Sequence, residues 1–342
     1  MNKDVLVRTA RAMVAPGKGI LAADESAGTI AKRFAAIGVD STQATRRDYR
    51  KLLFRAEEAI NRYISGVILF DETIRQTASD GTPLVKYIEA AGAIPGIKVD
   101  LGAKSLANFP GEMITEGLDG LLERLNDYRR LGARFAKWRA VISVDSDRGI
   151  PTDFAIETNA QALARYAALC QNADLVPIVE PEVLMDGEHD LERCGEVTEC
   201  VLKTVFMRLY EARIFLEGML LKPNMVVAGK KHPKRASPEE VALSTIRVLK
   251  NCVPAAVPGV AFLSGGQSDI EATANLDAIN RLGGPWALTF SYGRALQTAA
   301  LNTWSGMPSN VLDAQASFTH RAHMNALAAQ GQWTEMEERV AP

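Results

Sequence analysis

Eight short apolar runs, each ending in polar or glycine-rich residues, alternate along this sequence with segments of helical periodicity. A strand followed by a helix, repeated eight times, is typical of a parallel sheet that closes into a barrel. The sequence therefore predicts a single (β/α)8 TIM barrel, with extra helices at its N- and C-terminal ends. An open doubly wound sheet is the alternative, but that fold rarely needs eight units and leaves edge strands to be covered.

The predicted strands have the length and apolarity of strands that are buried on both faces of a sheet. In chain order they are Gly19–Ala23, Gly66–Phe70, Ile94–Val99, Phe135–Ile142, Leu175–Val179, Leu216–Leu221, Val260–Leu263 and Ala287–Phe290.

The segments between these runs repeat apolar residues with the period of an amphipathic helix. The clearest helix start is Ser237-Pro-Glu-Glu240, which has a capping serine, proline at the first helical position and glutamate at the third. Other predicted helices are Thr45–Ile60, Leu118–Tyr128 and Asn159–Leu169, with helical additions within Met1–Lys18 and Leu301–Pro342.

Composition places the chain among globular proteins. It has 342 residues, of which 47% are hydrophobic and 23% charged, with no low-complexity linker. We therefore expect one domain over residues 1–342. A formal net charge of -2 gives no electrostatic reason to expect nucleic acid or an anionic membrane as a partner.

No segment of the sequence reads as an export or membrane signal. The N-terminal residues lack a signal-peptide core, and no run is long and apolar enough to cross a bilayer. Four cysteines without a C-x-x-C pair are then expected to be reduced thiols, and the cytoplasm is the expected compartment.

Charged residues gather at the predicted C-terminal ends of the strands, which is where barrels of this fold carry their active sites. Lys222 ends the sixth run, and a desolvated lysine beside a second cation can become a nucleophile for carbonyl carbon. Residues two apart on a strand face the same side. The other strand-end residues are Asp24, Glu25, Ser26, Lys98, Asp100, Lys137, Arg139, Glu180 and Glu182.

Ion pairing is the alternative interpretation for each of these residues taken singly, and we expect it between Glu182 and Arg139. The convergence of so many charges where desolvation is expensive nevertheless indicates a catalytic rim. Glycine turns follow the seventh and eighth runs, and such loops commonly hold phosphate in this fold. The predicted phosphate residues are Ser264, Gly265, Ser291, Gly293 and Arg294.

Seven strand-end motifs together resemble those of class I fructose-1,6-bisphosphate aldolase. They are G-K-G-I-L-A-A-D-E-S, G-I-K-V-D, A-K-W-R, V-P-I-V-E-P-E, L-L-K-P-N-M, F-L-S-G-G-Q-S and W-A-L-T-F-S-Y-G-R-A-L. The resemblance implies a Schiff-base lyase of glycolysis and gluconeogenesis. This lyase cleaves fructose 1,6-bisphosphate reversibly to dihydroxyacetone phosphate and glyceraldehyde 3-phosphate, without a metal or cofactor. It also implies a homotetramer.

The same resemblance assigns a role to each motif residue. Lys222 forms the imine, with Lys137 as the neighbouring cation. Glu180 is the general acid and base of imine formation, and Glu182 orients the lysines. Asp24 takes the proton of the C4 hydroxyl. The C1 phosphate falls to Ser264, Gly265, Ser291, Gly293 and Arg294, and the sugar hydroxyls or C6 phosphate to Ser26, Thr29, Lys32, Arg33, Lys98 and Arg139.

The resemblance ends before the C-terminus. Family members of this type commonly finish in a mobile tail whose terminal tyrosine delivers a proton, whereas the last tyrosine here is Tyr292. We therefore expect the proton at the carbanion to pass through Glu180 or the substrate phosphate, and residues Glu335–Pro342 to be frayed.

Four rival interpretations remain open from sequence. His320 and His323 have the spacing of a metal pair, as in a metal-dependent aldolase, although a solvated helix face is expected. The basic run Lys230–Arg235 could touch nucleic acid, but we expect a solvated loop. A different imine-forming aldolase or a transaldolase would act on monophosphates, and a scaffolding barrel would keep the site without turning over.

Overall fold

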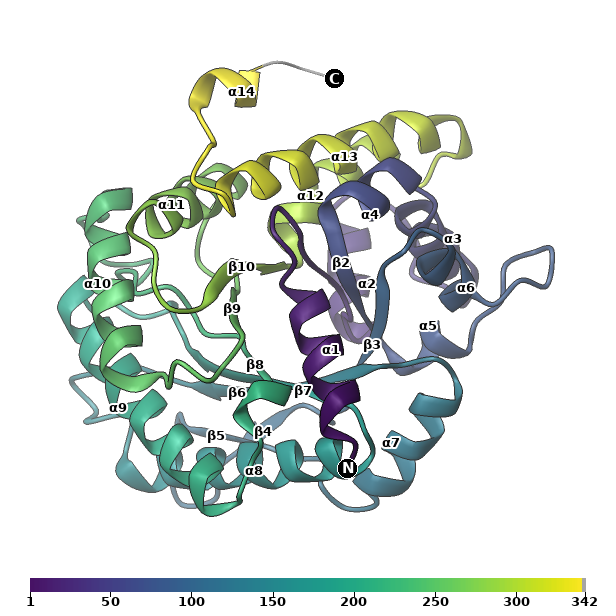
Figure 1. Ribbon diagram of the computed structural model, residues 1–342. Coiled ribbons are helices and arrows are strands. Elements are labelled where there is room, and N and C mark those ends of the chain that lie inside the picture. Colours follow the sequence, from purple (N-terminus) through teal and green to yellow (C-terminus); the bar gives the residue numbers. More distant parts are fainter. Residues whose placement is uncertain (340–342) are drawn as a thin grey trace.

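The core of the structure, a computed structural model that describes residues 1–339, is a closed barrel of eight parallel strands ringed by helices (Figure 1). The barrel prediction is confirmed, and the open sheet is wrong. Residues 340–342, the end of the predicted C-terminal addition, lie outside the described part. The barrel order is β1 (Gly19–Ala23), β10 (Ala287–Tyr292), β9 (Gly259–Phe262), β8 (Leu220–Leu221), β7 (Val176–Val183), β6 (Phe135–Ile142), β3 (Ile94–Lys98) and β2 (Ile64–Leu69).

The strand ends differ from the predicted ones where the chain becomes polar. β7 continues past the predicted end at Val179 through both glutamates, because it pairs along the whole of β6, with Arg139 opposite Glu180. β8 is shorter than predicted, since Leu216–Gly218 forms a 3-10 turn instead of strand. Apolarity alone therefore locates these strands but misplaces their ends.

A two-stranded antiparallel ribbon was not predicted. β4 (Ala103–Ser105) and β5 (Met113–Thr115) follow β3 and lie outside the barrel. Thr115 is tied to β6 because its hydroxyl donates to the carbonyl of Arg139 at 2.8 Å.

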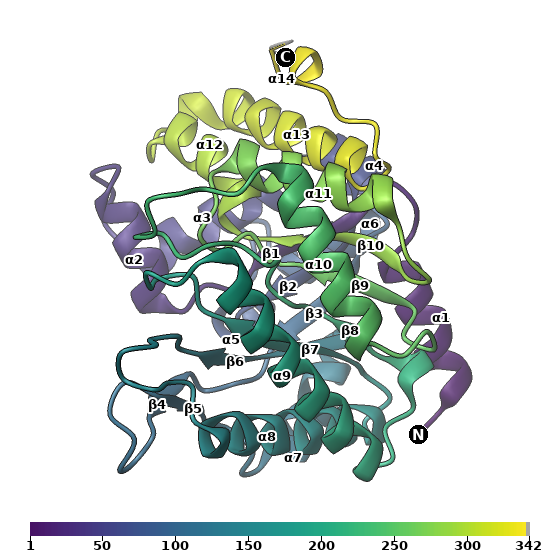
Figure 2. The same ribbon diagram turned by 90° about the vertical axis from the view of Figure 1, so that its left-hand side faces the viewer.

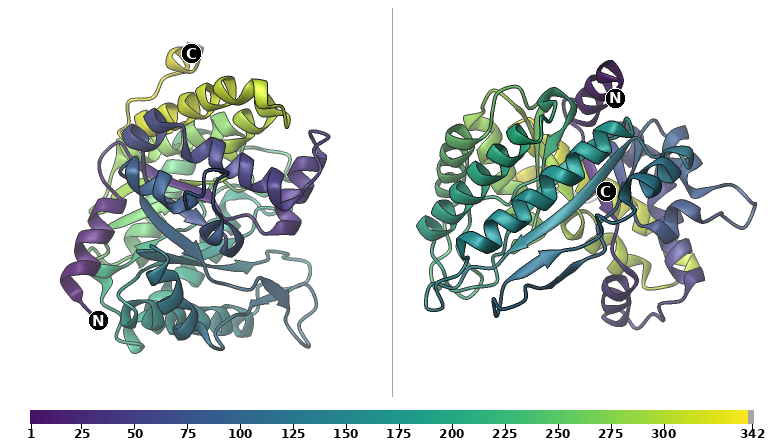
Figure 3. Two further views of the ribbon diagram at one scale, coloured as in Figure 1. Left: turned by 90° about the vertical axis from the view of Figure 1, so that its right-hand side faces the viewer. Right: turned by 90° about the horizontal axis from the view of Figure 1, so that it is seen from below.

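Helices cover the outside of the barrel on all sides, as the turned views show (Figures 2 and 3). The predicted helix Thr45–Ile60 is two helices, broken at Arg55 and Ala56. The helices are α1 (Lys3–Met13), α2 (Ala27–Ala35), α3 (Gln43–Phe54), α4 (Glu57–Tyr63), α5 (Asp71–Arg75), α6 (Leu84–Ala90), α7 (Leu121–Arg130), α8 (Asp153–Asn172), α9 (Leu191–Glu211), α10 (Pro238–Cys252), α11 (Asp269–Leu282), α12 (Arg294–Trp304), α13 (Val311–Ala328) and α14 (Glu335–Arg339).

The capping motif predicted for α10 is confirmed. Ser237 accepts the amide of Glu240 through its hydroxyl, and the Glu240 carboxylate accepts the amide of Ser237 in return. Across residues 1–339, no helix combines the length and apolarity that crossing a bilayer requires.

Two hydrophobic clusters fill the molecule. The larger lies between the outward faces of the strands and the helices, and the smaller fills the barrel interior. Leu6, Ala10 and Met13 of α1 belong to the interior cluster, so this N-terminal helix closes the N-terminal end of the barrel (Figure 1). The predicted catalytic rim lies at the opposite, C-terminal end of the barrel.

The inward face of the barrel changes from small or apolar to charged at a single level. On five strands, the inward-facing small or apolar residue nearest the C-terminal end of the barrel is followed two positions later by an ionisable residue. These pairs are Ala22 and Asp24, Gly96 and Lys98, Phe135 and Lys137, Ile178 and Glu180, and Leu220 and Lys222. Since side chains alternate along a strand, the charged layer sits directly on the apolar one.

We predict that Gly96→Ala lowers the free energy of unfolding by about 1–3 kcal/mol, the usual cost of overpacking. A Cβ at position 96 would lie 2.2 Å from the buried ring of Phe135. Chemical denaturation measures the loss. Gly28→Ala on α2 is the control, because nothing lies within 4 Å of its Cβ, and there stability should stay or rise. Equal stability of both variants would contradict the packing of Phe135 against β3.

Candidate active site

Eight charged side chains meet at the C-terminal mouth of the barrel. They come from β1, β3, β6, β7 and β8 or the residues just after them, and most are buried. Four are basic and four acidic, which balances the formal charge: Lys98, Lys137, Arg139 and Lys222 against Asp24, Asp100, Glu180 and Glu182. Burial on this scale is tolerated only when every charge has a partner.

Lys137 lies at the centre of this charged cluster. Its Nζ is 2.8 Å from Oδ2 of Asp24 and 3.2 Å from Oε2 of Glu180. Glu180 lies on the neighbouring strand, but Asp24 follows β1, which is not adjacent to β6 in the barrel. The Lys137–Asp24 ion pair therefore spans the mouth of the barrel.

Lys222 is placed by the end of β8. Its backbone amide donates to the carbonyl of Val179 at 2.8 Å, and its side chain is 5% exposed. Its Nζ lies 3.1 Å from Oε1 of Glu180. Glu180 thus bridges the amines of Lys137 and Lys222, one with each oxygen, and can exchange a proton with either.

The opposite charges around Lys137 shift the pKa of that lysine and of its two carboxylate partners. Burial by itself disfavours the charged form of Asp24, but Lys137 and Lys222 outweigh it and hold the pKa of Asp24 at about 2. Burial likewise opposes ionisation of Glu180, yet the same two lysines lower its pKa. The pKa of Lys137 is raised, because Asp24 and Glu180 outweigh the burial that would lower it. Asp24 and Glu180 are therefore carboxylates at neutral pH, and Lys137 carries its positive charge there.

The predicted ion pair of Arg139 with Glu182 is confirmed. A second pair joins Nζ of Lys98 to Oδ1 of Asp100 at 2.6 Å. The other oxygen of Asp100 accepts the backbone amide of Arg139 at 3.2 Å. Asp100 was noted at its strand end but given no role. Its position two residues after Lys98 was the available signal.

Four of the five residues predicted for the C1 phosphate flank the next two strand ends. Ser264 and Ser291 are buried, and the hydroxyl of Ser291 has no hydrogen-bond partner within the described residues. A Cβ at Gly265 would lie 3.1 Å from a Glu182 oxygen, so a larger residue there would require neighbouring side chains to shift. Gly293 precedes α12, whose N-terminal amides can bind an anion.

Arg294, the fifth of these residues, is the first residue of α12 and its side chain is exposed. An exposed guanidinium at a helix N-terminus is available for a bidentate contact with phosphate. The sequence prediction therefore placed all five residues at two neighbouring strand ends, β9 and β10.

Four residues predicted for the sugar hydroxyls or C6 phosphate lie on or just before α2, and they are less closely grouped with the charged cluster than the other predicted residues. Ser26 caps the helix by accepting the amide of Thr29 at 3.4 Å, and Arg33 pairs with Glu25. Thr29 and Lys32 are exposed, and in residues 1–339 neither pairs with a member of the charged cluster.

A buried network beside Asp24 was missed. The Glu25 carboxylate pairs with Arg33 and, at 2.6 Å, with Arg50, which is 2% exposed. Gln297 of α12 donates to Glu25 at 2.9 Å and to the carbonyl of Ala22 at 2.7 Å. This network holds α12 against the end of β1. Its members are too far apart in the chain for sequence spacing to reveal them.

The rival signals have other partners. The ring of His323 stacks on Tyr63 at 5.0 Å between centroids, and Nε2 of His320 lies 3.7 Å from Glu338. Within residues 1–339, no three His, Cys, Asp or Glu side chains are grouped to hold a metal. The basic run Lys230–Arg235 forms a largely exposed loop, as expected, with Lys230 paired to Asp186 at 2.8 Å.

We predict a pH dependence for Asp24→Asn. The wild type should be more stable by on the order of 2 kcal/mol, because Asp24 titrates near 2 in the folded chain instead of 3.8. A lowered pKa stabilises the fold above the unfolded pKa and loses that effect as pH falls through the folded pKa. Urea unfolding should therefore show a constant difference from pH 5 to 8. A difference that shrinks within that range would contradict the pairing.

Comparison with known proteins agrees with this geometry. The family model for class-I fructose-bisphosphate aldolase matches residues 5–341. A probable fructose-bisphosphate aldolase class 1 of Xanthomonas campestris is 57% identical over 97% of this chain and 99% of the relative. Fructose-bisphosphate aldolase C of Mus musculus is 54% identical over 97% and 92%.

Among solved structures, the fructose-bisphosphate aldolase of Plasmodium falciparum, in a ternary complex with TRAP and a small-molecule inhibitor, superposes with a TM-score of 0.95. It is 50% identical, over 97% of this chain and 95% of that one. With a family model that matches almost the whole length, relatives above half identity and a buried lysine–carboxylate centre at the mouth of a barrel, the chain belongs to the class I fructose-bisphosphate aldolase family.

Proposed function

We propose that Lys222 is the lysine through which this aldolase forms its Schiff base. The enzyme cleaves fructose 1,6-bisphosphate reversibly to dihydroxyacetone phosphate and glyceraldehyde 3-phosphate, as its family does. The observation that carries the proposal is the 3.1 Å contact between the buried Lys222 amine and a Glu180 oxygen. An amine that attacks a carbonyl needs a proton acceptor at this distance.

Imine formation can be written with the residues in place. The neutral Lys222 amine attacks the C2 carbonyl carbon, the nitrogen loses one proton to Glu180, and the C2 oxygen takes one proton from solvent to become a hydroxyl. The protonated Glu180 then gives that proton to the departing C2 hydroxyl, which leaves as water. The charge of Lys137, 3.2 Å from the other Glu180 oxygen, favours the deprotonated form of Glu180 once Glu180 has given up its proton.

Carbon–carbon cleavage follows from the protonated imine. Asp24, ionised and across the mouth from Glu180, takes the proton of the C4 hydroxyl. The C4–O electrons form the aldehyde, the C3–C4 bond breaks, and its electron pair moves into the imine to give an enamine. Glyceraldehyde 3-phosphate leaves, C3 is protonated, and hydrolysis of the imine releases dihydroxyacetone phosphate. We assign the proton at C3 to Glu180 or the substrate phosphate.

The remaining residues hold the substrate in this proposal. Glu182 and Arg139 keep the charged cluster balanced beside Glu180. The C1 phosphate is assigned to Ser264, Gly265, Ser291, Gly293 and Arg294, and the hydroxyls or C6 phosphate to Ser26, Thr29, Lys32, Arg33, Lys98 and Arg139. The monophosphate aldolase, the transaldolase, the metal-dependent aldolase and the scaffolding barrel are all wrong as identities, because the family is the class I fructose-bisphosphate aldolases.

We predict that borohydride with dihydroxyacetone phosphate inactivates the enzyme and labels the segment Gly218–Met225, where Lys222 is the sole lysine. EDTA should leave activity unchanged. Peptide mapping by mass spectrometry locates the label. Lys222→Met should abolish labelling, whereas Lys230→Met, in the following exposed loop, should not. Label on another lysine, or activity lost to EDTA, would overturn the assignment.

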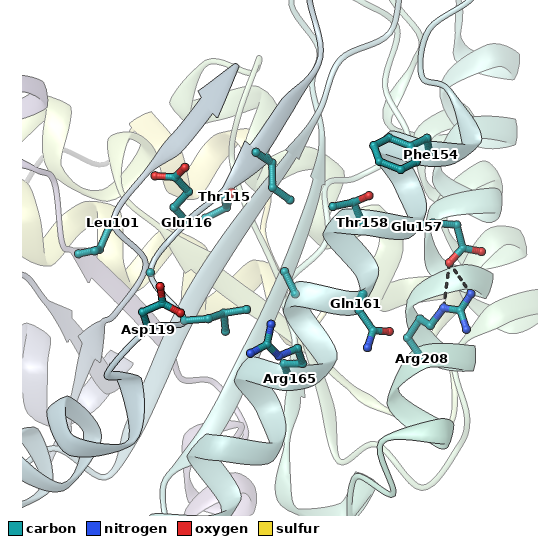
Figure 4. A pocket seen from close by; sticks show the side chains of 14 residues that line it. Leu101, Thr115, Glu116, Asp119, Phe154, Glu157, Thr158, Gln161, Arg165 and Arg208 are labelled. Carbon is teal, nitrogen blue, oxygen red and sulfur yellow. Dashed lines mark hydrogen bonds and ion pairs between the residues drawn. The ribbon is translucent and has the colours of Figure 1, made fainter. Parts of the chain in front are cut away.

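We also propose a single domain, a cytoplasmic enzyme and a homotetramer. A cavity of about 940 Å³ opens between the β4–β5 ribbon and α8, and it is lined by Leu101 and Phe154 (Figure 4). These two side chains are 64% and 53% exposed, and Tyr210 of the adjacent α9 is 81% exposed. Exposed apolar surface of this kind supports a subunit interface here.

We predict that Phe154→Arg shifts the oligomer towards smaller species, because it places a charge in the proposed interface. Sedimentation velocity measures the change. Leu312→Arg is the matched control, since Leu312 is 77% exposed but lies on α13. A tetramer that survives Phe154→Arg unchanged would place the interface elsewhere.

A further inference from the structure

The C-terminal segment is anchored at Trp333 and Glu338, contrary to the expectation of a frayed end over Glu335–Pro342, of which 340–342 lie outside the described residues. The carboxylate of Glu338 on α14 pairs with Arg321 of α13 and accepts the indole N–H of Trp333 at 3.0 Å. Trp333 is itself 7% exposed, and its amide donates to Asp277 of α11 at 2.8 Å. Figure 1 shows α14 outside α13, at the edge of the barrel. A deletion that begins at Trp333 would therefore break specific contacts.

Arg321 joins this segment to α11. Its side chain is 5% exposed. One Nη donates to Glu338, and the other donates to the hydroxyl of Thr273 at 2.6 Å and to the carbonyl of Asp269 at 3.2 Å. Asp269 and Thr273 lie in the first turns of α11. The position of those turns therefore depends on where the guanidinium is held.

The first turns of α11 support both phosphate-binding strand ends. The Ser264–Gly265 turn is separated from Asp269 by only three residues, and Ser268 caps the helix. The hydroxyl of Tyr292, between Ser291 and Gly293, donates to the carbonyl of Ala272 at 2.9 Å. A shift of these turns would thus move the residues at both strand ends, Ser264–Gly265 after β9 and Ser291–Gly293 at the end of β10.

The charges around Asp269 link the same turns to Arg294. Burial raises the pKa of Asp269, and the positive charges of Arg321 and Arg294 oppose that rise. Glu338 acts in the same direction as burial. The charges of both guanidinium groups thus act on Asp269. The carboxylate that pairs directly with Arg321 is that of Glu338, on α14.

We propose that Arg321 is a positioning residue for the C1-phosphate site and that Glu338 of α14 keeps it in place. The proposal rests on the assignment of the C1 phosphate to the strand ends of β9 and β10. Without Glu338, a buried guanidinium loses its counter-ion and keeps its contacts to the Thr273 hydroxyl and the Asp269 carbonyl of α11. A shift of the guanidinium would displace the first turns of α11 and, through them, the strand ends assigned to the phosphate.

The test compares two full-length variants with the same charge change on one helix. In Glu338→Gln we expect the KM for fructose 1,6-bisphosphate and the inhibition constant of inorganic phosphate to rise by about tenfold, the size of a lost charged hydrogen bond. We expect kcat to stay within about twofold. Glu337→Gln, at an exposed neighbour, should leave all three values unchanged. Glu338→Asp should restore part of the phosphate affinity.

Simple destabilisation would lower the amount of active enzyme, and therefore kcat, without raising the inhibition constant of phosphate. If phosphate binds to Glu338→Gln as it does to wild type, the positioning role is wrong. In the double variant Glu338→Gln/Arg321→Met, the effects should be less than additive because the residues act together. Full additivity would contradict the coupling. If Arg321→Met does not fold, the comparison of Glu338→Gln with Glu338→Asp decides.

The proposed function can fail separately from this inference. Arg294→Ala should weaken phosphate inhibition, because it removes a direct contact. If Arg294→Ala and Glu338→Gln both leave the inhibition constant unchanged, the C1-phosphate assignment is wrong. If Arg294→Ala alone raises it, the assignment stands and the role of Glu338 is wrong.

Discussion

The bridge that Glu180 makes between Lys137 and Lys222 is the interaction on which the rest of the site depends. An isolated ammonium would be too costly at the mouth of a closed barrel, so two of them require an acid that reaches both. The bridge works because Glu180 and Lys137 lie on neighbouring strands and Lys222 follows the next strand, with the inward faces in phase. Asp24 then completes the pairing from across the barrel. The side chains proposed for catalysis therefore also serve as counter-ions to one another.

Much of this arrangement could be predicted from the sequence, because it depends on two local regularities. Apolar runs located all eight barrel strands, and alternation placed Lys137 with Arg139 and Glu180 with Glu182 on one side. The strand ends were less predictable. Glu180 looked like the residue after a strand, whereas ladder pairing with β6 carries β7 to Val183.

The residues that sequence reasoning missed are those whose partners are distant in the chain. Arg50 looked like the polar side of an amphipathic helix, yet its guanidinium lies 2.6 Å from Glu25 and is almost completely buried. Arg321 gave no local signal either, because its partners Asp269 and Glu338 come from two other helices. Arg50 joins α3 to the end of β1, and Arg321 joins α13 to α11 and α14. These contacts depend on tertiary packing, which the periodicity of a sequence does not predict.

The ion pair between Lys137 and Asp24 also has a consequence for how the enzyme becomes active during folding. Asp24 follows the first strand of the chain, and Lys137 lies on β6, on the far side of the ring. The ring is complete only when β1 pairs with β10, which arrives more than 250 residues later in the chain. Until β10 closes the ring, β1 is joined to β6 only through β2 and β3, so the open sheet does not fix the distance across the mouth from Asp24 to Lys137. Recovery of activity on refolding therefore reports closure of the ring, and not the earlier formation of strands and helices.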